Sequence, residues 1–333
     1  MNCTRFHLRF YSTSHFNLKQ TPGSTKVDDA LQVFDEMLQR QPPPSIVQFN
    51  KLITLIVKMK HYSTALSLFK KVNLMGIPSN LYAMTISINC HCRLNQVAYG
   101  FALLATIFKL GYPPSLATYT TLIHGLVLAD WVFEVVELFK KLLREKVCEP
   151  DQITFGVVIN GLCKVGDTSK ALELLRFMEP VSCKCKPSMG SNKLMKDVNL
   201  YNILIKGCRK CGKLDLAMDL FGELSLKGLK PNVRTYTVTI SVLCQQGLFG
   251  EANNLLRKME ENGCSPNSVT CNVIVQEFLK QKAFQEAEIL LEEMIIRGFS
   301  PDSATFEMLL HHIPSKGQDS PMRIIIQKLT NKQ

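Results

Sequence analysis

The amino-acid sequence predicts an all-α protein, an α-solenoid of stacked helical hairpins, and three observations support this fold class. Residues 198–232 contain two short helical patterns separated by a glycine break. The same arrangement recurs at steps of about 35 residues along most of the 333-residue chain. Apolar residues keep fixed positions within each step. Because one such hairpin cannot cover its own apolar face, neighbouring hairpins must stack on it.

The hairpin at residues 198–232 shows how one repeat is built. Its first helix is predicted from about Asn199 to Lys210, with apolar residues recurring every three or four positions. Gly212 ends this helix, because glycine adopts the left-handed conformation that helix ends often require. The second helix is predicted from about Leu214 to Ser225. Pro231 follows it and cannot continue a helix.

Seven full repeats follow from this spacing, and three positions test their register. The repeats cover residues 46–80, 81–115, 116–151, 152–197, 198–232, 233–267 and 268–302. The eighth position is aliphatic throughout: Ile53, Ile88, Ile123, Ile159, Ile205, Ile240 and Val275. The twentieth is mostly small: Ala65, Gly100, Val135, Ala171, Ala217, Ala252 and Ala287. The twenty-third is always leucine: Leu68, Leu103, Leu138, Leu174, Leu220, Leu255 and Leu290. We expect all three positions to lie in the core.

Partial repeats are predicted at both ends of the array. Residues 27–45 fit a second helix with its exit loop, and residues 303–313 begin a further first helix. Residues 314–333 form a tail in which Met322–Leu329 is predicted to be a short closing helix over the last apolar face. The fourth repeat is eleven residues too long. We interpret residues 180–197 as a loop insertion or the remnant of a lost repeat.

The N-terminal segment, residues 1–26, has the composition of an organelle transit peptide. It contains no acidic residue and is rich in arginine, lysine, serine and threonine. The run from Arg9 to Ser12 resembles a mitochondrial processing site, with cleavage after Tyr11. A disordered basic tail is the alternative. We expect a mitochondrial location, with the chloroplast as the second choice.

Composition favours a polyanionic partner. The formal net charge is +11 and the sequence pI is about 9.1. A basic surface that only serves solubility is the alternative interpretation. No apolar run approaches the length of a membrane span. The single tryptophan argues against aromatic stacking as the main design.

The twelve cysteines do not resemble a disulfide framework. Cys92, Cys163 and Cys244 share the twelfth position of their repeats, and Cys208 lies one place earlier, at small positions predicted to be buried. Free thiols imply a reducing compartment. A Cys-x-x-Cys ends at Cys211 and a Cys-x-Cys precedes it, but a zinc site needs four converging ligands. We predict no metal and no cofactor.

Two polar positions are candidates for reading bases. The fifth position carries short polar side chains in the middle of a helix, where they are poor helix formers: Asn50, Thr85, Thr120, Gly156, Asn202, Thr237 and Asn272. The last position is also polar: Asn80, Ser115, Asp151, Asp197, Asn232, Asn267 and Asp302. Helix N-capping explains the last position equally well. We expect the fifth residues to line one open channel, where they can hydrogen-bond base edges.

The thirteenth position is basic in five of seven repeats: Lys58, Arg93, Lys164, Lys210 and Lys280. It lies about 80° from the fifth position around the first helix. These cations are candidates for contacting phosphates. The alternative is that they stabilise the C-terminal end of each helix dipole.

The repeat resembles a known family. The 35-residue spacing, the motif at Val198–Phe221, and exits such as Lys-Pro-Asn resemble pentatricopeptide repeat (PPR) proteins of the P class over residues 27–310. Further segments are similar to the restorer-of-fertility-like branch of plant mitochondrial PPR proteins. The resemblance implies a right-handed superhelix that binds single-stranded RNA, one base per repeat. It also implies that the fifth and last residues together choose the base.

Applied to this chain, the family's code implies Y-R-G-N-Y-A-U, read 5′ to 3′. Gly156 has no reading side chain, and the length of the fourth repeat puts Asp197 in doubt. We therefore expect the fourth repeat to break the run of base contacts. The code does not resolve the pair of Thr85 and Ser115 beyond a purine.

The sequence therefore predicts a sequence-selective binder of organellar single-stranded RNA that acts in transcript processing, stability or translation. We expect a monomer, no catalytic activity, and a recruited processing factor as a second partner. A protein-binding helical scaffold and a truncated, inactive family member are the alternatives. Catalysis lacks support, because no histidine begins a His-x-Glu motif and no nucleophile or paired carboxylates are recognisable.

Overall fold

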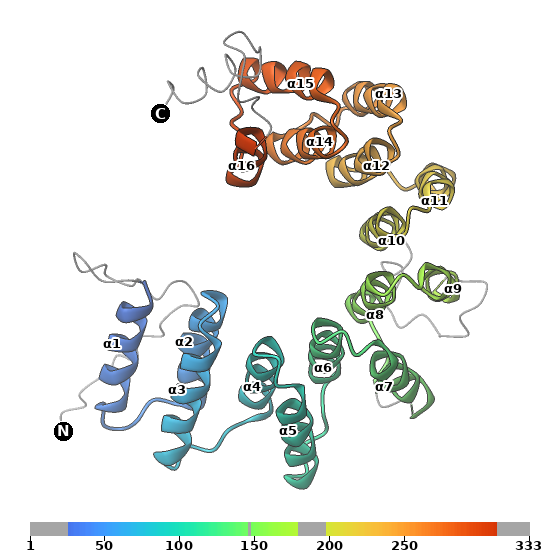
Figure 1. Cartoon of the computed structure of the whole chain (residues 1–333). Helices are drawn as coiled ribbons and strands as arrows, with labels where there is room; N and C mark the ends of the chain where they lie inside the picture. The colour runs from blue at the N-terminus through green and yellow to red at the C-terminus, as the bar shows by residue number, and fades with distance from the viewer. Residues whose placement is uncertain (1–25, 146–147, 179–197, 312–333) are drawn as a thin grey trace, which may run out of the picture. The chain divides into compact units, whose positions relative to one another are not determined.

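The computed structural model describes residues 26–145, 148–178 and 198–311 (Figure 1). Several predictions lie outside these residues. They are the transit peptide with its processing site, the insertion at residues 180–197 together with Asp197, and the closing helix at Met322–Leu329. The chain divides into two compact units, the N-terminal unit ending at Ala129 and the C-terminal unit beginning at Asp130.

All regular structure in the described residues is helical, which confirms the all-α prediction. The helices of the N-terminal unit are α1 (Lys26–Leu38), α2 (Ile46–Lys58), α3 (Tyr62–Leu74), α4 (Leu81–Arg93), α5 (Val97–Lys109) and α6 (Leu116–Leu128). Those of the C-terminal unit are α7 (Val132–Glu145), α8 (Gln152–Lys164), α9 (Thr168–Phe177), α10 (Val198–Lys210), α11 (Leu214–Leu226), α12 (Val233–Gln245), α13 (Phe249–Glu261), α14 (Ser268–Lys280), α15 (Phe284–Ile296) and α16 (Ser303–His311).

The even-numbered helices from α2 to α14 are the first helices of the repeats, and each begins at the residue where its repeat begins in sequence. Most helices are 13 residues long because a glycine or polar turn follows each one. Gly212, for example, has a φ of 65°, a value that glycine adopts without a Cβ penalty. The hairpin predicted at residues 198–232 differs from the observed one by a single residue at two helix ends.

In the N-terminal unit, the first helices build the central layer. Helix α4 packs against α2, α3, α5 and α6, and α2 packs against α1 and α3. One apolar cluster runs from Ala30 to Cys90, with Phe34 and Phe49 meeting edge to face at 5.5 Å between ring centroids. The partial repeat that contains α1 therefore covers the first full repeat.

In the C-terminal unit, α8, α10, α12 and α14 stack on one another in order (Figure 1). The long fourth repeat does not interrupt this stack. Helices α8 and α10 pack directly, although 33 residues separate Lys164 from Val198. The reason is topological, because the extra residues fall between α9 and α10 and leave both hairpins intact.

Two of the three register positions are buried in every repeat. The eighth and twentieth residues are all buried, as predicted. The leucine position is buried in four repeats but only half-buried at Leu103, Leu138 and Leu174. Leu103 faces a groove beside α3. Leu138 lies on α7, the N-terminal helix of the C-terminal unit, and Leu174 lies on α9, which has only 10 residues.

Glycine and cysteine set the distance between successive first helices. A Cβ on Gly125 of α6 would lie 2.2 Å from Sγ of Cys92 on α4. A Cβ on Gly207 of α10 would likewise lie 2.4 Å from Sγ of Cys163 on α8. Both cysteines are buried free thiols, as predicted, and burial raises the pKa of Cys163 to about 12. These thiols therefore fill packing positions.

Candidate nucleic-acid interface

The last residue of a repeat caps the first helix of the next repeat. Each of the six described residues accepts a hydrogen bond from the backbone N–H three residues later. The distances are 2.9 Å at Asn80, 3.3 Å at Ser115, 2.8 Å at Asp151, 3.0 Å at Asn232, 2.9 Å at Asn267 and 2.8 Å at Asp302. Capping is thus one role of this position, and each capping oxygen also contacts a second side chain of the protein.

The fifth and last residues of a repeat come together, although they lie about 30 positions apart in sequence. In the first repeat, Nδ2 of Asn50 donates to Oδ1 of Asn80 at 3.2 Å. In the seventh repeat, the backbone N–H of Asp302 donates to Oδ1 of Asn272 at 2.9 Å. Each pair lies where the next first helix begins, so both side chains share one end of that helix.

Where the fifth residue is threonine, a buried threonine of the next repeat links the pair. Oγ1 of Thr85 lies 3.0 Å from Oγ1 of Thr118, which lies 3.0 Å from Oγ of Ser115. In the sixth repeat, which belongs to the C-terminal unit, Oγ1 of Thr237 lies 2.9 Å from Oγ1 of Thr270. Thr270 in turn donates to Oδ1 of its N-cap residue, Asn267, at 3.1 Å. Fifth and last residues are therefore coupled in two chemically different ways.

Three repeats depart from this arrangement: the third, the fourth and the fifth, in which the side chain of Asn202 makes no hydrogen bond among the described residues. Thr120 belongs to the N-terminal unit and Asp151 to the C-terminal unit. Oγ1 of Thr120 donates to the carbonyl of Leu116 at 2.9 Å. Gly156, which has no reading side chain, is buried against Leu200 of α10.

The fifth residues were expected to line an open channel, and for the asparagines this expectation is wrong. Asn50, Asn202 and Asn272 are only 2–3% exposed. Their side chains follow core residues on the first helix and are covered by the start of the next repeat. The threonines Thr85, Thr120 and Thr237 are half-buried, and the last residues are half-buried or exposed. The accessible half of each pair is therefore mainly the last residue.

Asn202 differs from the other buried asparagines. Among the described residues, neither Oδ1 nor Nδ2 of Asn202 has a hydrogen-bond partner, and Oδ1 of Asn50 also lacks one. Leaving a buried amide unpaired costs about 1–3 kcal/mol. Unpaired buried groups are rare in folded proteins, so this position calls for an explanation.

The predicted phosphate-contacting residues all lie on the protein surface. Lys58, Arg93, Lys164, Lys210 and Lys280 are exposed at the ends of their first helices. Two of them already contact carboxylates, because Lys164 lies 3.3 Å from Asp130 and Lys280 lies 2.8 Å from Glu277. Each of these two cations is therefore partly neutralised by its partner.

Three successive repeats of the C-terminal unit contribute to one basic pocket of about 260 Å³. Lys210, Gln245 and Lys280, which share the thirteenth position, line it together with Arg209 and Glu277. Glu277 accepts from Arg209 at 3.0 Å and from Lys280 at 2.8 Å, and its side chain is only 5% exposed. Sequence reasoning missed Glu277, and its one signal is a carboxylate at a tenth position where three other repeats have glycine.

The second position was also missed. In four of the seven repeats it carries a large apolar side chain that remains in solvent: Val47 is 53% exposed, Tyr82 57%, Ile153 69% and Val269 67%. The second and fifth residues lie about 300° apart around a helix, or 60° the other way, so they share a face. The recurring apolar residue two places after the N-cap is the signal that could have found it. Such side chains can pack against the face of a base.

Among the described residues, no three His, Cys, Asp or Glu side chains gather in a way that could hold a metal ion. Within the same residues, none of the helices combines the length and apolar character that a membrane span requires.

The stacked 35-residue hairpins with their recurring polar pairs define the class: a helical-repeat protein. Models of the PPR repeat family match residues 196–245, 238–278 and 266–313. PPR repeat models match residues 146–179 and 117–147, and a pentatricopeptide repeat domain model matches residues 24–83. These matches span most of the chain, which therefore belongs to the pentatricopeptide repeat family.

Curated relatives from Arabidopsis thaliana are much longer than the segments that match. The putative pentatricopeptide repeat-containing protein At1g12700, mitochondrial, is 39% identical over 34% of this chain and 19% of its own length. The pentatricopeptide repeat-containing protein At1g12300, mitochondrial, is 40% identical over 27% of this chain and 14% of its own. The matched segment thus spans less than a fifth of each relative.

Solved structures share the fold. The maize pentatricopeptide repeat protein PPR10 aligns with a TM-score of 0.53 at 20% identity, covering 92% of this chain and 47% of PPR10. PPR10 in complex with an 18-nucleotide psaJ RNA element aligns with a TM-score of 0.54 at 21% identity, over 80% of this chain and 42% of PPR10.

Proposed function

We propose that this protein binds single-stranded RNA, with one base facing the fifth and last residues of each repeat. The observation that carries the proposal is the recurring contact between these two residues, direct in the first and seventh repeats and through a threonine in the second and sixth. A pair of adjacent donors and acceptors is what recognition of one base edge requires. The complex of PPR10 with RNA adds support from a protein of the same fold.

Asn202 is the residue on which we expect base choice to depend most. Its amide makes no hydrogen bond to the described residues that a base would have to replace. Nδ2 of Asn272, in contrast, donates to the carbonyl of Ser268 at 2.8 Å, and this hydrogen bond would have to break. A base edge that pairs with Asn202 would remove the cost of an unsatisfied buried amide. The fifth base of the target is then a pyrimidine, from the code that the family resemblance implies.

The cations of the thirteenth position would hold the phosphates. Lys58, Arg93 and Lys210 are exposed and make no ion pair among the described residues. Contacts of this kind strengthen binding to any sequence and weaken as salt rises. They complement the base-reading pairs, which supply selectivity.

The biological role that fits is control of organellar transcripts by occupancy: protection, processing or translation, with binding rather than catalysis as the activity. Relatives whose names place them in mitochondria support that compartment. The proposed layout keeps residues 1–26 as the transit peptide, residues 27–313 as the repeat array, and residues 314–333 as its tail. A monomer suffices, because each site is built within one chain.

The test is binding of the full chain to a labelled RNA carrying Y-R-G-N-Y-A-U and to shuffled RNAs, measured by fluorescence anisotropy. We expect the designed RNA to bind at least tenfold more tightly, which corresponds to about 1.4 kcal/mol. Asn202→Thr should shift the preference at the fifth base from pyrimidine towards purine. Asn253→Thr makes the same chemical change on the exposed side of α13 and should leave the preference unchanged. Equal affinity for shuffled RNAs would refute the proposal.

A further inference from the structure

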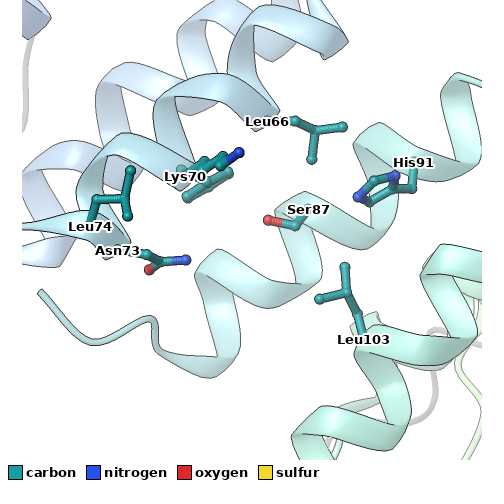
Figure 2. A pocket seen from close by; sticks show the side chains of 8 residues that line it. Leu66, Lys70, Asn73, Leu74, Ser87, His91 and Leu103 are labelled. Carbon is teal, nitrogen blue, oxygen red and sulfur yellow. The ribbon is translucent and has the colours of Figure 1, made fainter. Parts of the chain in front are cut away.

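A groove lies between the second helices α3 and α5 of the N-terminal unit, with α4 as its floor (Figure 2). Its volume is about 350 Å³, enough to receive a few side chains of a partner. Leu103 of α5 lines this groove, although its position is buried in four other repeats. The groove therefore exposes a position at which apolar packing is the rule.

The walls of the groove are apolar. Leu66, Phe69 and Leu74 of α3 line it together with Leu103 of α5. Leu74 is 78% exposed at the rim. Apolar surface gathered around a recess is typical of a binding site for another molecule.

Lys70 is the one lysine, arginine, aspartate or glutamate among the residues that line the groove. The sequence contains no acidic residue between Glu36 and Asp130, while eight lysines and arginines lie in this interval. Lys70 lines the groove, is exposed, and makes no ion pair among the described residues. Its neighbour Lys71 contacts Asp35 at 4.0 Å. An apolar recess with an unpaired cation complements a ligand that is both apolar and acidic.

The floor of the groove is held in place. The ring of His91 stacks on Tyr99 with 5.3 Å between ring centroids, and Nδ1 of His91 lies 2.9 Å from Oε1 of Gln96. Ser87 donates to the carbonyl of Ala83 at 3.0 Å. Little conformational freedom is lost here when a ligand binds, which favours affinity.

The groove and the base-reading residue occupy different sides of α4. Ser87 and His91 follow Thr85 by two and six residues, which places them about 200° and 240° around the helix from it. A ligand in the groove would therefore leave the pair formed by Thr85 and Ser115 free for RNA.

We propose that this groove is the docking site for an acidic amphipathic helix of a partner protein. The helix would place apolar side chains, spaced three or four residues apart, against Leu66, Phe69 and Leu103. Its carboxylates would face Lys70 at the rim. RNA is a poor occupant because Lys70 is the one cation lining the groove that could meet phosphates, and a membrane surface cannot enter a recess. The site does not depend on the proposed reading of RNA.

The test uses the full chain and a fluorescein-labelled synthetic peptide of 15 residues, about four helical turns, with leucines on one face and glutamates on the other. We expect saturable binding in anisotropy measurements. Lys70→Glu should weaken it about tenfold, and Leu74→Ser by a smaller factor. Lys140→Glu is the matched control, because Lys140 holds the same repeat position on α7, and it should leave affinity unchanged. Both Lys70 and Leu74 are exposed, and circular dichroism melts check that each variant folds.

Two control peptides, a competition with RNA and a binding test with vesicles complete the design. Peptides with lysine for glutamate or serine for leucine should not bind, and saturating RNA should not displace the original peptide. Unchanged affinity in Lys70→Glu, or displacement by RNA, would overturn the proposal. If the peptide fails to bind while phosphatidylglycerol vesicles bind and release on Lys70→Glu, the face recognises a membrane and the proposal is equally wrong.

Discussion

The two units of this protein stack the same hairpin by different means. In the N-terminal unit, acidic residues are absent after Glu36, and the one ion pair among its described residues joins Lys71 and Asp35 at 4.0 Å. In the C-terminal unit, ion pairs connect separate helices: Arg176 of α9 with Glu223 of α11, and Arg209 of α10 with Glu277 of α14. The packing of small residues between first helices is common to both. Close packing of small residues between first helices is thus sufficient for stacking, and ion pairs between α9 and α11 and between α10 and α14 add to it in the C-terminal unit.

The largest expected effects come from changing the glycines that pack against a cysteine of the neighbouring first helix. Gly207→Ala and Gly125→Ala each place a Cβ within 2.4 Å of a buried cysteine sulfur. We expect each to destabilise its own unit by about 1–3 kcal/mol through overpacking. Hydrogen exchange measured by mass spectrometry resolves the two units. Similar losses of stability in both would support the same packing role for glycine and cysteine in each.

A helical glycine without close neighbours supplies the control. A Cβ on Gly222 of α11 meets nothing within 4 Å. Gly222→Ala should therefore stabilise the C-terminal unit by about 0.5–1 kcal/mol, because alanine has the higher helix propensity. A loss of stability in this variant would show that glycine matters at these helices for reasons other than space.

The caps come next. Asn80→Ala in the N-terminal unit and Asp302→Ala in the C-terminal unit each remove an acceptor for a backbone N–H. We expect losses of about 1 kcal/mol in both, measured by chemical denaturation. Asp302→Asn keeps the cap and should spare stability while changing base preference at the seventh base. Equal base preference in Asp302→Asn and the parent would leave capping as the only role of this position.

Loss of the ion pairs that Glu223 makes with Arg176 and Lys227 should lower stability by a smaller, pH-dependent amount. Burial alone would raise the pKa of Glu223, but hydrogen bonds from Arg176 and Lys227 hold this pKa below its ordinary value of 4.5. Stability from Glu223 is therefore present above pH 4.5 and is lost as pH falls through the lower pKa of the folded state. Glu223→Gln should cost about 0.5–1 kcal/mol at pH 7. The difference from the parent should vanish at low pH, and a difference that persists there would contradict the ionic origin.

The smallest effect concerns phosphates. Lys210→Gln should lower RNA affinity only a few-fold for all sequences, and should reduce the slope of log affinity against log salt by about 0.7. Lys280→Gln should change the slope less, because Glu277 already pairs with Lys280. Equal slopes for the two variants would show that Glu277 does not shield Lys280.

The sequence by itself determined the hairpin, its register and most of its core. Helix period and repeat length are local properties, so the eighth and twentieth positions could be assigned as buried without coordinates. The N-cap interpretation of the last position followed from the same local chemistry.

Tertiary structure alone decided how deep the fifth position lies and which side chains from distant repeats meet. Asn202 is buried because α12 begins beside it, and Glu277 meets Arg209 from 68 positions away. The groove beside Leu103 depends on how closely α3 and α5 approach α4. These outcomes depend on the volumes and orientations of several helices at once, and a periodic pattern along one chain does not encode the distance between its repeats.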